Sequence, residues 1–192
     1  MKPALWGPGL WHLMFSITWN CRDLEMTPAL MRVIFYHIPT LLPCKLCQEH
    51  YVRHRSGLNR RLGEPKTSAG VLTWLYYLKD EVNKSLRTRS IPLDELRQRF
   101  LLFGGRLDDV LVADTLVMLA IATETTGDED VFIDFCGHLA RLLPLPDDSE
   151  LLRTLQRVRR PVTAHAYRVC KNTRIEHGIR YPTLDHLRRS LA

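Results

Sequence analysis

The chain has 192 residues, of which 45% are hydrophobic, 25% charged and 8% aromatic. This composition is typical of a globular protein with one large or two small domains, and the 10 glycines and 11 prolines exclude a collagen-like or low-complexity chain. No segment has the roughly 18 consecutive apolar residues of a membrane-spanning helix, so we expect no membrane span. Gly7-Pro8-Gly9 interrupts the apolar stretch over 1–18, and no small-residue cleavage site follows, so we expect no signal peptide.

The net charge of +6 is unevenly distributed. Residues 151–192 carry ten Lys and Arg against two acids, whereas residues 101–150 carry eleven acids and only two arginines. Adjoining segments of opposite charge are expected to compensate each other in the fold. A basic segment without interleaved aromatic residues is also a weak signal for nucleic acid, so nucleic-acid binding is not favoured.

The first half of the chain shows helical periodicity, and strand signals are scarce. Five helices are predicted there: 9–19, 27–39, one that follows Leu41-Leu42-Pro43 and carries two cysteines, one capped by Thr67 or Ser68, and 90–103 behind Pro92. The fourth has an apolar stripe formed by Val71, Leu75, Leu78, Val82 and Leu86. Five helices within about a hundred residues predict a compact all-α bundle.

The second half repeats this rhythm, with helices expected at 108–125, 129–142, 147–158, 161–176 and 183–191. Three pairs of segments are similar and occur in the same order: Gly9–Thr18 with Asp114–Thr123, Tyr36–Pro43 with Gly137–Pro144, and Ile91–Arg97 with Tyr181–Arg188. One hypothesis is a degenerate internal duplication, in which Leu145-Pro146-Asp147-Asp148 replaced the cysteine pair. The alternative is chance similarity between short leucine-rich helices. Residues 1–104 and 105–192 are the corresponding predicted domains.

Five cysteines are too few for a disulfide scaffold, and an odd number leaves at least one unpaired. Cys44 and Cys47 form a Cys-x-x-Cys pair, whereas Cys21, Cys136 and Cys170 are solitary. Two cysteines three apart at a helix start can close a small, reducible disulfide. The helix N-terminus stabilises a thiolate there, which lowers the thiol pKa and speeds exchange with another disulfide. The alternatives are two buried cysteines or half of a metal site.

His50 and His54 follow the cysteine pair and make a zinc site worth considering. The four side chains are spaced by three, three and four residues, so they lie along one helical face. Tetrahedral zinc normally needs a chain reversal between its two pairs of ligands. Four ligands from one straight helix cannot surround one ion, so no metal is expected here.

Three segments resemble, in the right order, the Erv/ALR family of FAD-dependent sulfhydryl oxidases. They are Trp6-Gly-Pro-Gly-Leu-Trp11, Leu42-Pro-Cys-Lys-Leu-Cys-Gln-Glu-His-Tyr51 and Trp74-Leu-Tyr-Tyr-Leu-Lys-Asp-Glu-Val-Asn-Lys-Ser-Leu86. The resemblance covers roughly residues 5–100. It implies a bundle of four helices plus a short fifth, with a flavin slot between the helices and a second all-helical half behind it.

The resemblance implies an enzyme in which Cys44 and Cys47 are the catalytic redox disulfide beside FAD. A substrate thiolate attacks Cys44, Cys47 is released toward the flavin, and the electrons pass through FAD to O2, which gives hydrogen peroxide. The residues implied to bind FAD are Gly7, Trp11, His50, Val82 and Asn83, with Phe15 and Lys79 at positions that contact the flavin in relatives. Without the resemblance, Trp11 and Trp74 are core residues and His50 is a solvated one.

The sequence departs from the family pattern at several of these positions. Phe15 stands where members usually have a histidine, Pro8 replaces an arginine, and Lys79-Asp80 replaces a His-Asn pair. Aromatic stacking can substitute for the imidazole against the adenine. The lost histidine resembles divergent members from large DNA viruses, some of which add a helical second domain or a degenerate second copy. This implies a viral protein in the host cytoplasm, the nucleus or the virion.

The implied partners are thiol-containing protein substrates or a redox partner protein. Relatives are commonly homodimers through the first two helices, so a degenerate second copy would give an intrachain pseudodimer. Cys136 and Cys170 are a candidate structural disulfide, and Cys21 a candidate shuttle thiol, since no second close cysteine pair exists. The competing function is a catalytically inactive helical interaction module.

Overall fold

A computed structural model describes residues 3–21, 27–103, 107–143, 149–176 and 183–191. Its described part contains helices and connecting loops and no strand, so the predicted all-α class is confirmed. The elements are α1 (Pro3–Asn20), α2 (Thr27–Arg32), the π-helical turn η1 (Val33–His37), α3 (Ile38–Leu41), α4 (Lys45–Leu62), α5 (Ser68–Ser85), α6 (Leu93–Phe103), α7 (Asp109–Thr126), α8 (Glu129–Leu142), α9 (Glu150–Leu155), α10 (Val162–Glu176) and α11 (Leu184–Leu191).

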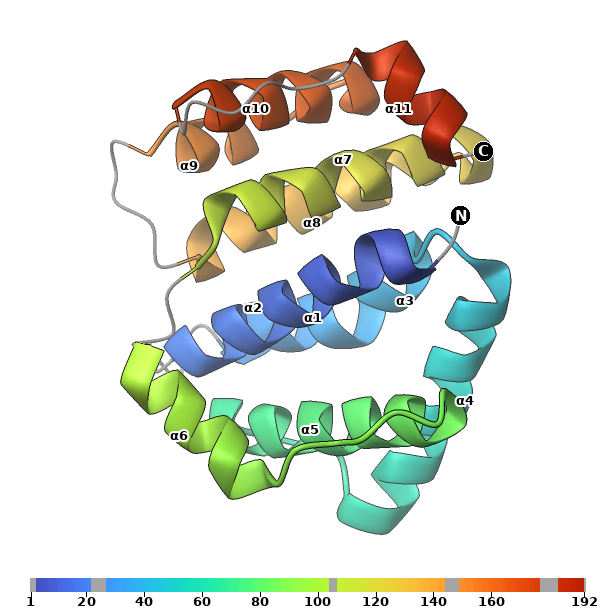
Figure 1. The fold of residues 1–192 in the computed structure, drawn as a ribbon, viewed down its shortest axis with the longest axis vertical. Helices are drawn as coiled ribbons and strands as arrows, with labels where there is room; N and C mark the ends of the chain where they lie inside the picture. The colour runs from blue at the N-terminus through green and yellow to red at the C-terminus, as the bar shows by residue number, and fades with distance from the viewer. Residues whose placement is uncertain (1–2, 22–26, 104–106, 144–148, 177–182, 192) are drawn as a thin grey trace.

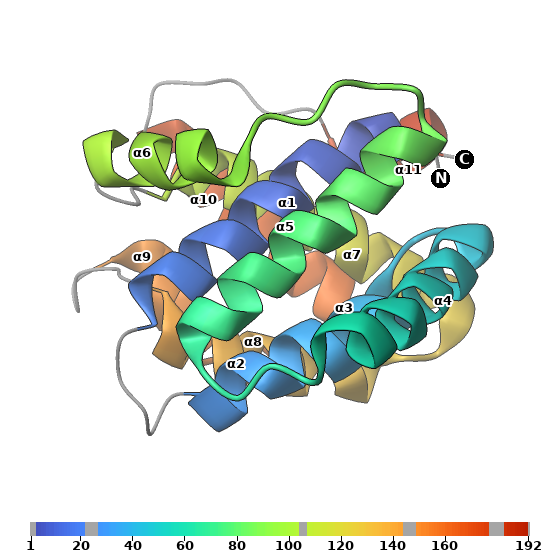
Figure 2. The same cartoon turned by 90° about the horizontal axis from the view of Figure 1, so that it is seen from below.

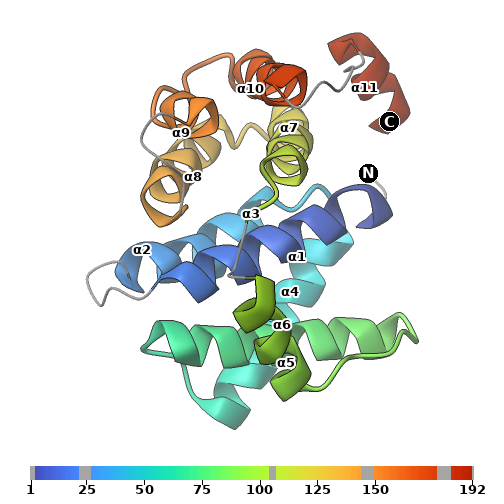
Figure 3. The ribbon, with the colours of Figure 1, turned by 60° about the vertical axis from the view of Figure 1, so that its left-hand side comes forward.

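The helices stack in successive layers (Figures 1 and 3). Helices α4, α5 and α6 form one outer layer, and α9, α10 and α11 form the other. Between them, α1 with the α2–α3 stretch lies against α7 with α8. The central contact is therefore made by elements from both halves of the chain.

Helix α1 begins six residues earlier than the sequence predicts, at Pro3 rather than Gly9. It contains Pro8, which lacks the N–H that would bond to the Ala4 carbonyl. That carbonyl lies in the first turn, so the proline removes one hydrogen bond near the end of the helix and not in its middle. Ten residues of α1 are buried, which is why packing overrides the low helix propensity of Gly7 and Gly9.

The second predicted helix continues beyond Pro39 to Leu41, but through a π turn. Pro39 has no N–H for the Phe35 carbonyl, four residues earlier. The Ile38 N–H bonds instead to the Val33 carbonyl, five residues earlier, which is π-helical pairing. This leaves the carbonyls of Ile34 and Phe35 to find donors outside their own helix.

Helix α4 supplies those donors. The Tyr51 hydroxyl donates to the Ile34 carbonyl at 2.6 Å, and Arg55 Nη1 donates to the Phe35 carbonyl at 2.7 Å. One turn earlier, Gln48 Nε2 donates to the carbonyls of Thr40 and Leu42, each at 3.0 Å. Three side chains of α4, spaced three and four apart, therefore fix its first turns, and with them the cysteine pair, against the preceding helical stretch.

Helix α5 begins as predicted, with Thr67 as its cap: the Thr67 hydroxyl accepts a 3.1 Å hydrogen bond from the Gly70 N–H. Val71, Leu75 and Leu78 of the predicted stripe are fully buried. The prediction is wrong for Leu86, which is 65% exposed because α5 ends at Ser85 and the chain then turns away. Helix α6 begins directly after Pro92, as the proline predicts.

The two halves present matching elements to each other. Helices α1 and α7 both have 18 residues and pack together, while α1 also packs on α5 and α7 on α10. The approach is closest at Gly9, where an added Cβ would overlap Thr115 Oγ1. This arrangement agrees with a degenerate duplication whose second half covers the first two helices. Duplication, the domain boundary and the pseudodimer remain predictions.

The second-half predictions place the helices well: α8 has the predicted bounds 129–142, α10 and α11 each begin one residue later than predicted, and α7 is shifted by one residue at both ends. Helix α9 is shorter than predicted, and residues 147 and 148 of that prediction lie outside the described part. Residues 145–148, which are proposed to replace the cysteine pair, also lie outside it. None of the described helices has the length and apolarity needed to cross a membrane.

The opposite charges of 101–150 and 151–192 meet as expected. Arg174 pairs with Asp114, Arg188 Nη2 lies 2.6 Å from Glu124 Oε1, and Arg160 Nη2 lies 2.7 Å from Asp130 Oδ1. The basic segment thus packs on the acidic one. Because most of these side chains are partly exposed to water, which screens their charges, the pairs add little to stability and chiefly balance the charge between the two segments.

The proposed disulfide between Cys136 and Cys170 is wrong. Both side chains are buried but no bond joins them. The Cys170 thiol instead donates to Asp114 Oδ1 at 2.9 Å, and burial raises the pKa of the Cys136 thiol. Cys21 is 5% exposed, which does not suit the shuttle role considered above.

Candidate redox site

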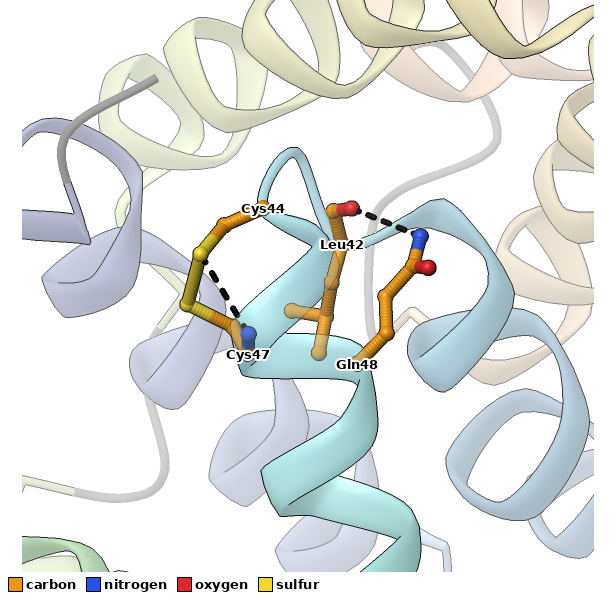
Figure 4. The surroundings of a disulfide bond; sticks show 4 residues. All are labelled: Leu42, Cys44, Cys47 and Gln48. Carbon is orange, nitrogen blue, oxygen red and sulfur yellow. Dashed lines mark hydrogen bonds between the residues drawn. A yellow bond between two sulfur atoms is a disulfide. The ribbon is translucent and has the colours of Figure 1, made fainter.

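Cys44 and Cys47 form a disulfide across the first turn of α4, with their Cα atoms 5.1 Å apart (Figure 4). Cys44 is the N-cap residue, with extended backbone at φ −146°, and its sulfur accepts a 3.3 Å hydrogen bond from the Cys47 N–H. Pro43 disfavours helical backbone at the preceding residue, and Leu42 accordingly leaves the helical region with ψ 126°, which ends the preceding helix before Cys44. The disulfide is therefore built at a helix N-terminus.

The helix N-terminus favours negative charge on the Cys44 sulfur. Unpaired N–H groups and the helix dipole stabilise an anion at the N-cap, and the Cys47 N–H already points to this sulfur. Lys45 adds a positive charge next to it in the chain. Both cysteines are half-buried and pack against the hydrophobic core. The pair can thus be reached from outside while held by the fold.

The disulfide and Gln48 lie on opposite sides of the first turn of α4 (Figure 4). Cys47, His50 and His54 follow one another at helical spacing on the disulfide side. The His50 and His54 rings are 6.3 Å apart, and burial lowers the pKa of His54 in spite of the opposing charge of Glu81 on α5. Arg61, seven residues beyond His54, has its Nη1 3.7 Å from Glu81 Oε1, so this side of α4 faces α5.

Trp11, Phe15 and Lys79 form a cluster between α1 and α5. The Lys79 Nζ lies 5.8 Å from the Trp11 ring centre and 5.5 Å from the Phe15 ring centre, and the two rings are 6.2 Å apart. Burial lowers the pKa of the Lys79 ammonium. The two ring faces, one helix turn apart, hold the Lys79 ammonium between α1 and α5, and its positive charge suits a negatively charged group.

Helices α1 and α5 run antiparallel side by side (Figure 2). One turn from the cluster, Gly7 on α1 therefore lies toward the part of α5 that carries Val82 and Asn83. Gly7 is buried, yet an added Cβ would meet no atom within 4 Å, so there is open space beside it. Asn83 Nδ2 donates to Ser90 Oγ at 3.1 Å.

The structure thus brings together two groups of the predicted site residues. Cys44 is bonded to Cys47, and Lys79 contacts Trp11 and Phe15. For the other four, the structure gives a place on the helices that flank these groups: Gly7, His50, Val82 and Asn83. The core interpretation fits Trp74, which is 1% exposed and donates to Asn59 Oδ1 at 2.9 Å, better than it fits the half-buried Trp11.

A groove of about 580 Å³ lies on the other side of α4, and sequence analysis missed it. None of the predicted cofactor residues lines it; its walls are Phe35, Tyr36, Pro39, Thr40, Lys45, Gln48, Val52, Arg55, Thr126 and Asp128. The sequence signal that could have predicted this groove is the recurrence of side chains at 45, 48, 52 and 55, a spacing that places them on one face of the helix. The groove adjoins Cys44 through Lys45.

Sequence analysis also missed a cluster of two histidines and a carboxylate. His37, Asp134 and His138 have ligand atoms within 4.8 Å of one another. His37 lies 97 residues before Asp134, so no local motif predicts the cluster. No family model, curated protein or solved structure matches the chain.

Proposed function

We propose that this protein is an FAD-dependent thiol oxidase that introduces disulfide bonds into protein substrates. The observation that carries the proposal is the Cys44–Cys47 disulfide at the N-terminus of α4, half-buried and within an all-α bundle. Three sequence segments that resemble the Erv/ALR family support it. The helices that carry these segments pack in series, with α4 on α5 and α5 on α1.

The side chains present suit a flavin nucleotide. A buried glycine with open space beside it leaves room for a ring, and two aromatic faces with a cation suit an adenine and a phosphate. The indole N–H of Trp6, next to Gly7, is buried without a hydrogen-bond partner in the described part of the chain. A buried donor without a partner is costly, so a ligand that accepts from it would relieve that cost.

The thiol chemistry follows from the position of the pair. A substrate thiolate attacks the Cys44 sulfur, the Cys44–Cys47 bond breaks, and Cys47 leaves as a thiolate. A second substrate thiolate then attacks the substrate sulfur of the mixed disulfide and releases the Cys44 thiolate, which the helix N-terminus stabilises as a leaving group. The substrate gains a disulfide, and its two electrons now reside on the reduced pair.

Bound FAD would supply the acceptor for these two electrons and pass them to O2, giving hydrogen peroxide. Cys47 lies on the side of α4 that faces α5, where Lys79, Val82 and Asn83 would hold the cofactor. Trp11 and Phe15 would stack on it from α1, and His50 would flank it on α4. The chain's own contribution is to hold the reactive sulfur and the cofactor in one orientation.

The experiment is an absorbance spectrum of the purified protein, followed by oxygen uptake with dithiothreitol. We expect flavin absorbance at about 450 nm from the cofactor, and oxygen uptake that is lost in Cys44→Ala and in Cys47→Ala. Cys136→Ala is the matched control, because Cys136 is buried and forms no disulfide. It should retain uptake.

A protein that stays colourless after FAD is added would contradict the proposal and favour the inactive interaction module. Flavin binding without oxygen uptake would point to a different electron acceptor. Uptake that survives both cysteine substitutions would remove the disulfide from the reaction. These outcomes separate the cofactor, the acceptor and the cysteine pair from one another.

A further inference from the structure

His37, Asp134 and His138 meet where the first half of the chain contacts the second. His37 ends the π turn η1, and the other two lie one turn apart on α8. The His37 Nε2 is 2.9 Å from Asp134 Oδ2, and His138 Nδ1 is 3.4 Å from Asp134 Oδ1. The two imidazole rings are 5.2 Å apart.

The π turn determines where His37 points. Each residue of a π turn advances less around the axis than in an α-helix, so the insertion rotates the following side chains. His37 is thereby fully buried against α8, with its Nδ1 unpartnered in the described part of the chain. Single π turns occur frequently at functional sites.

The two histidines occupy equivalent positions in similar segments, Tyr36-His-Ile-Pro39 and Gly137-His-Leu-Ala140. Equivalent residues of two similar halves come into contact where the halves are related by rotation. A pair of imidazoles at such a contact resembles a ligand set shared by two subunits. The adjacent carboxylate makes the set asymmetric and supplies a third ligand.

We propose that His37, Asp134 and His138 form a binding site for Zn²⁺ that links η1 to α8. Two imidazole nitrogens and one carboxylate oxygen are ligands that Zn²⁺ commonly takes, with a fourth position open to water. Ligand atoms about 2.0–2.1 Å from a tetrahedral ion lie roughly 3.3–3.4 Å from one another. His37 Nε2 lies 2.9 Å from Asp134 Oδ2 and His138 Nδ1 lies 3.4 Å from Asp134 Oδ1, and the three ligand atoms lie within 4.8 Å of one another, so the two histidines must move closer together to share one ion.

Zn²⁺ would replace the hydrogen bonds that now join these groups. His138 Nδ1 is 2.9 Å from the Asp134 backbone carbonyl, but that carbonyl also accepts the helical N–H of His138, so it keeps a partner. Arg32 Nε donates to Asp134 Oδ2 at 3.0 Å and can remain as an outer hydrogen bond that orients the carboxylate. The Asp134 side chain is 42% exposed, so an ion can enter from that side.

The site goes beyond the proposed thiol oxidation and does not depend on it. The ligands belong to the central layers, not to α4 or α5. An ion held by η1 on one side and α8 on the other would stabilise the contact between the two halves. We therefore expect Zn²⁺ to raise the thermal midpoint of unfolding, since it binds the folded chain.

The test uses the full chain without a histidine tag, with the Cys44–Cys47 disulfide oxidised, and ZnCl2 as the probe. Isothermal titration and metal analysis after desalting should give one Zn²⁺ per chain. Asp134→Asn and His138→Gln should each weaken binding at least about tenfold, as even outer-sphere substitutions at zinc sites do. His54→Gln is the matched control, because it disrupts the only other closely spaced histidine pair that the described residues show, His50 with His54, and it should leave binding unchanged.

A wild-type chain that retains no Zn²⁺ would overturn the site, whatever the variants do. Equal binding by wild type and Asp134→Asn, with loss in His54→Gln, would assign the ion to α4 instead. Co²⁺ provides a second measurement on the wild type alone, which does not depend on folding of a variant. Intense visible bands of tetrahedral Co²⁺ that Zn²⁺ displaces support the site, whereas weak octahedral bands contradict it.

Discussion

The hydroxyl of Tyr51 on α4 donates a 2.6 Å hydrogen bond to the carbonyl of Ile34 inside the π turn. The bond exists because Pro39 lacks an N–H and the Ile38 N–H is already bonded to Val33. Helix α4 therefore completes the hydrogen bonding of the stretch before it. The same contact fixes the orientation of the cysteine pair, so stability and the proposed chemistry share one anchor.

Tyr51→Phe should destabilise the fold by about 1–3 kcal/mol, because it leaves the buried Ile34 carbonyl without a donor. The free energy of unfolding from urea titration measures this. Tyr76→Phe, at a half-buried position on α5, is the matched control and should change little. The loss should shrink in a Pro39→Ala background, since an alanine in place of the proline restores a backbone N–H to the turn. An equal loss in both backgrounds would contradict the link to Pro39.

Gly9→Ala and Gly7→Ala should have opposite effects on stability. A Cβ at Gly9 would overlap Thr115 Oγ1 and lie 3.2 Å from the Leu111 carbonyl, so α1 and α7 must separate. We expect a loss of about 1–3 kcal/mol there. A Cβ at Gly7 meets no atom within 4 Å, and alanine favours the helix by up to about 1 kcal/mol, so stability should be kept or raised. Urea titration of both variants decides; similar losses would contradict the open space at Gly7.

Lys79→Met should weaken FAD binding by about 10- to 150-fold, the range expected when one hydrogen bond to a charged group, here a phosphate of the cofactor, is lost. The fold should not suffer, because the change removes a charge whose burial is unfavourable. Fluorescence of released flavin on dilution gives the dissociation constant. Lys84→Met is the control, since Lys84 is exposed on the same helix and pairs with Asp80. Equal weakening by both would show a general charge effect.

Acidification should destabilise the protein below about pH 6.5. Burial lowers the pKa of His37 from its usual 6.5, although the hydrogen bond to Asp134 opposes this, and burial lowers the pKa of His12 and His54 as well. Below 6.5 the unfolded chain therefore binds more protons than the folded one, so stability falls as the pH falls. The Asp134 pKa is lowered from 3.8, so its own effect lies at lower pH.

The thermal midpoint measured between pH 7.5 and pH 5, with EDTA present to exclude bound metal, tests this expectation. His12→Gln and His54→Gln should each flatten the decline, because each removes one group that the folded state keeps neutral. A midpoint that stays constant or rises on acidification would contradict the direction of these pKa shifts.

Sequence alone determined most of the helices and their starts. Thr67 caps α5 and Pro92 precedes α6, because capping hydrogen bonds and proline geometry are local. The cysteine pair at the start of α4 was predicted for the same reason. Its use in an oxidase stays a prediction, and so does the role of the seven expected cofactor residues.

Only the tertiary structure decided how the helices use their backbone groups and which distant residues meet. Pro39 indicates an interruption, but whether the chain ends its helix or continues through a π turn depends on donors from α4, namely Tyr51 and Arg55. The contact of His37 with Asp134 and His138, and the separation of Cys136 from Cys170, depend on how α8 packs against η1 and α10. These contacts join residues far apart in the chain, and no local propensity encodes them, because their free energy comes from burial and pairing that exist only once the layers have packed.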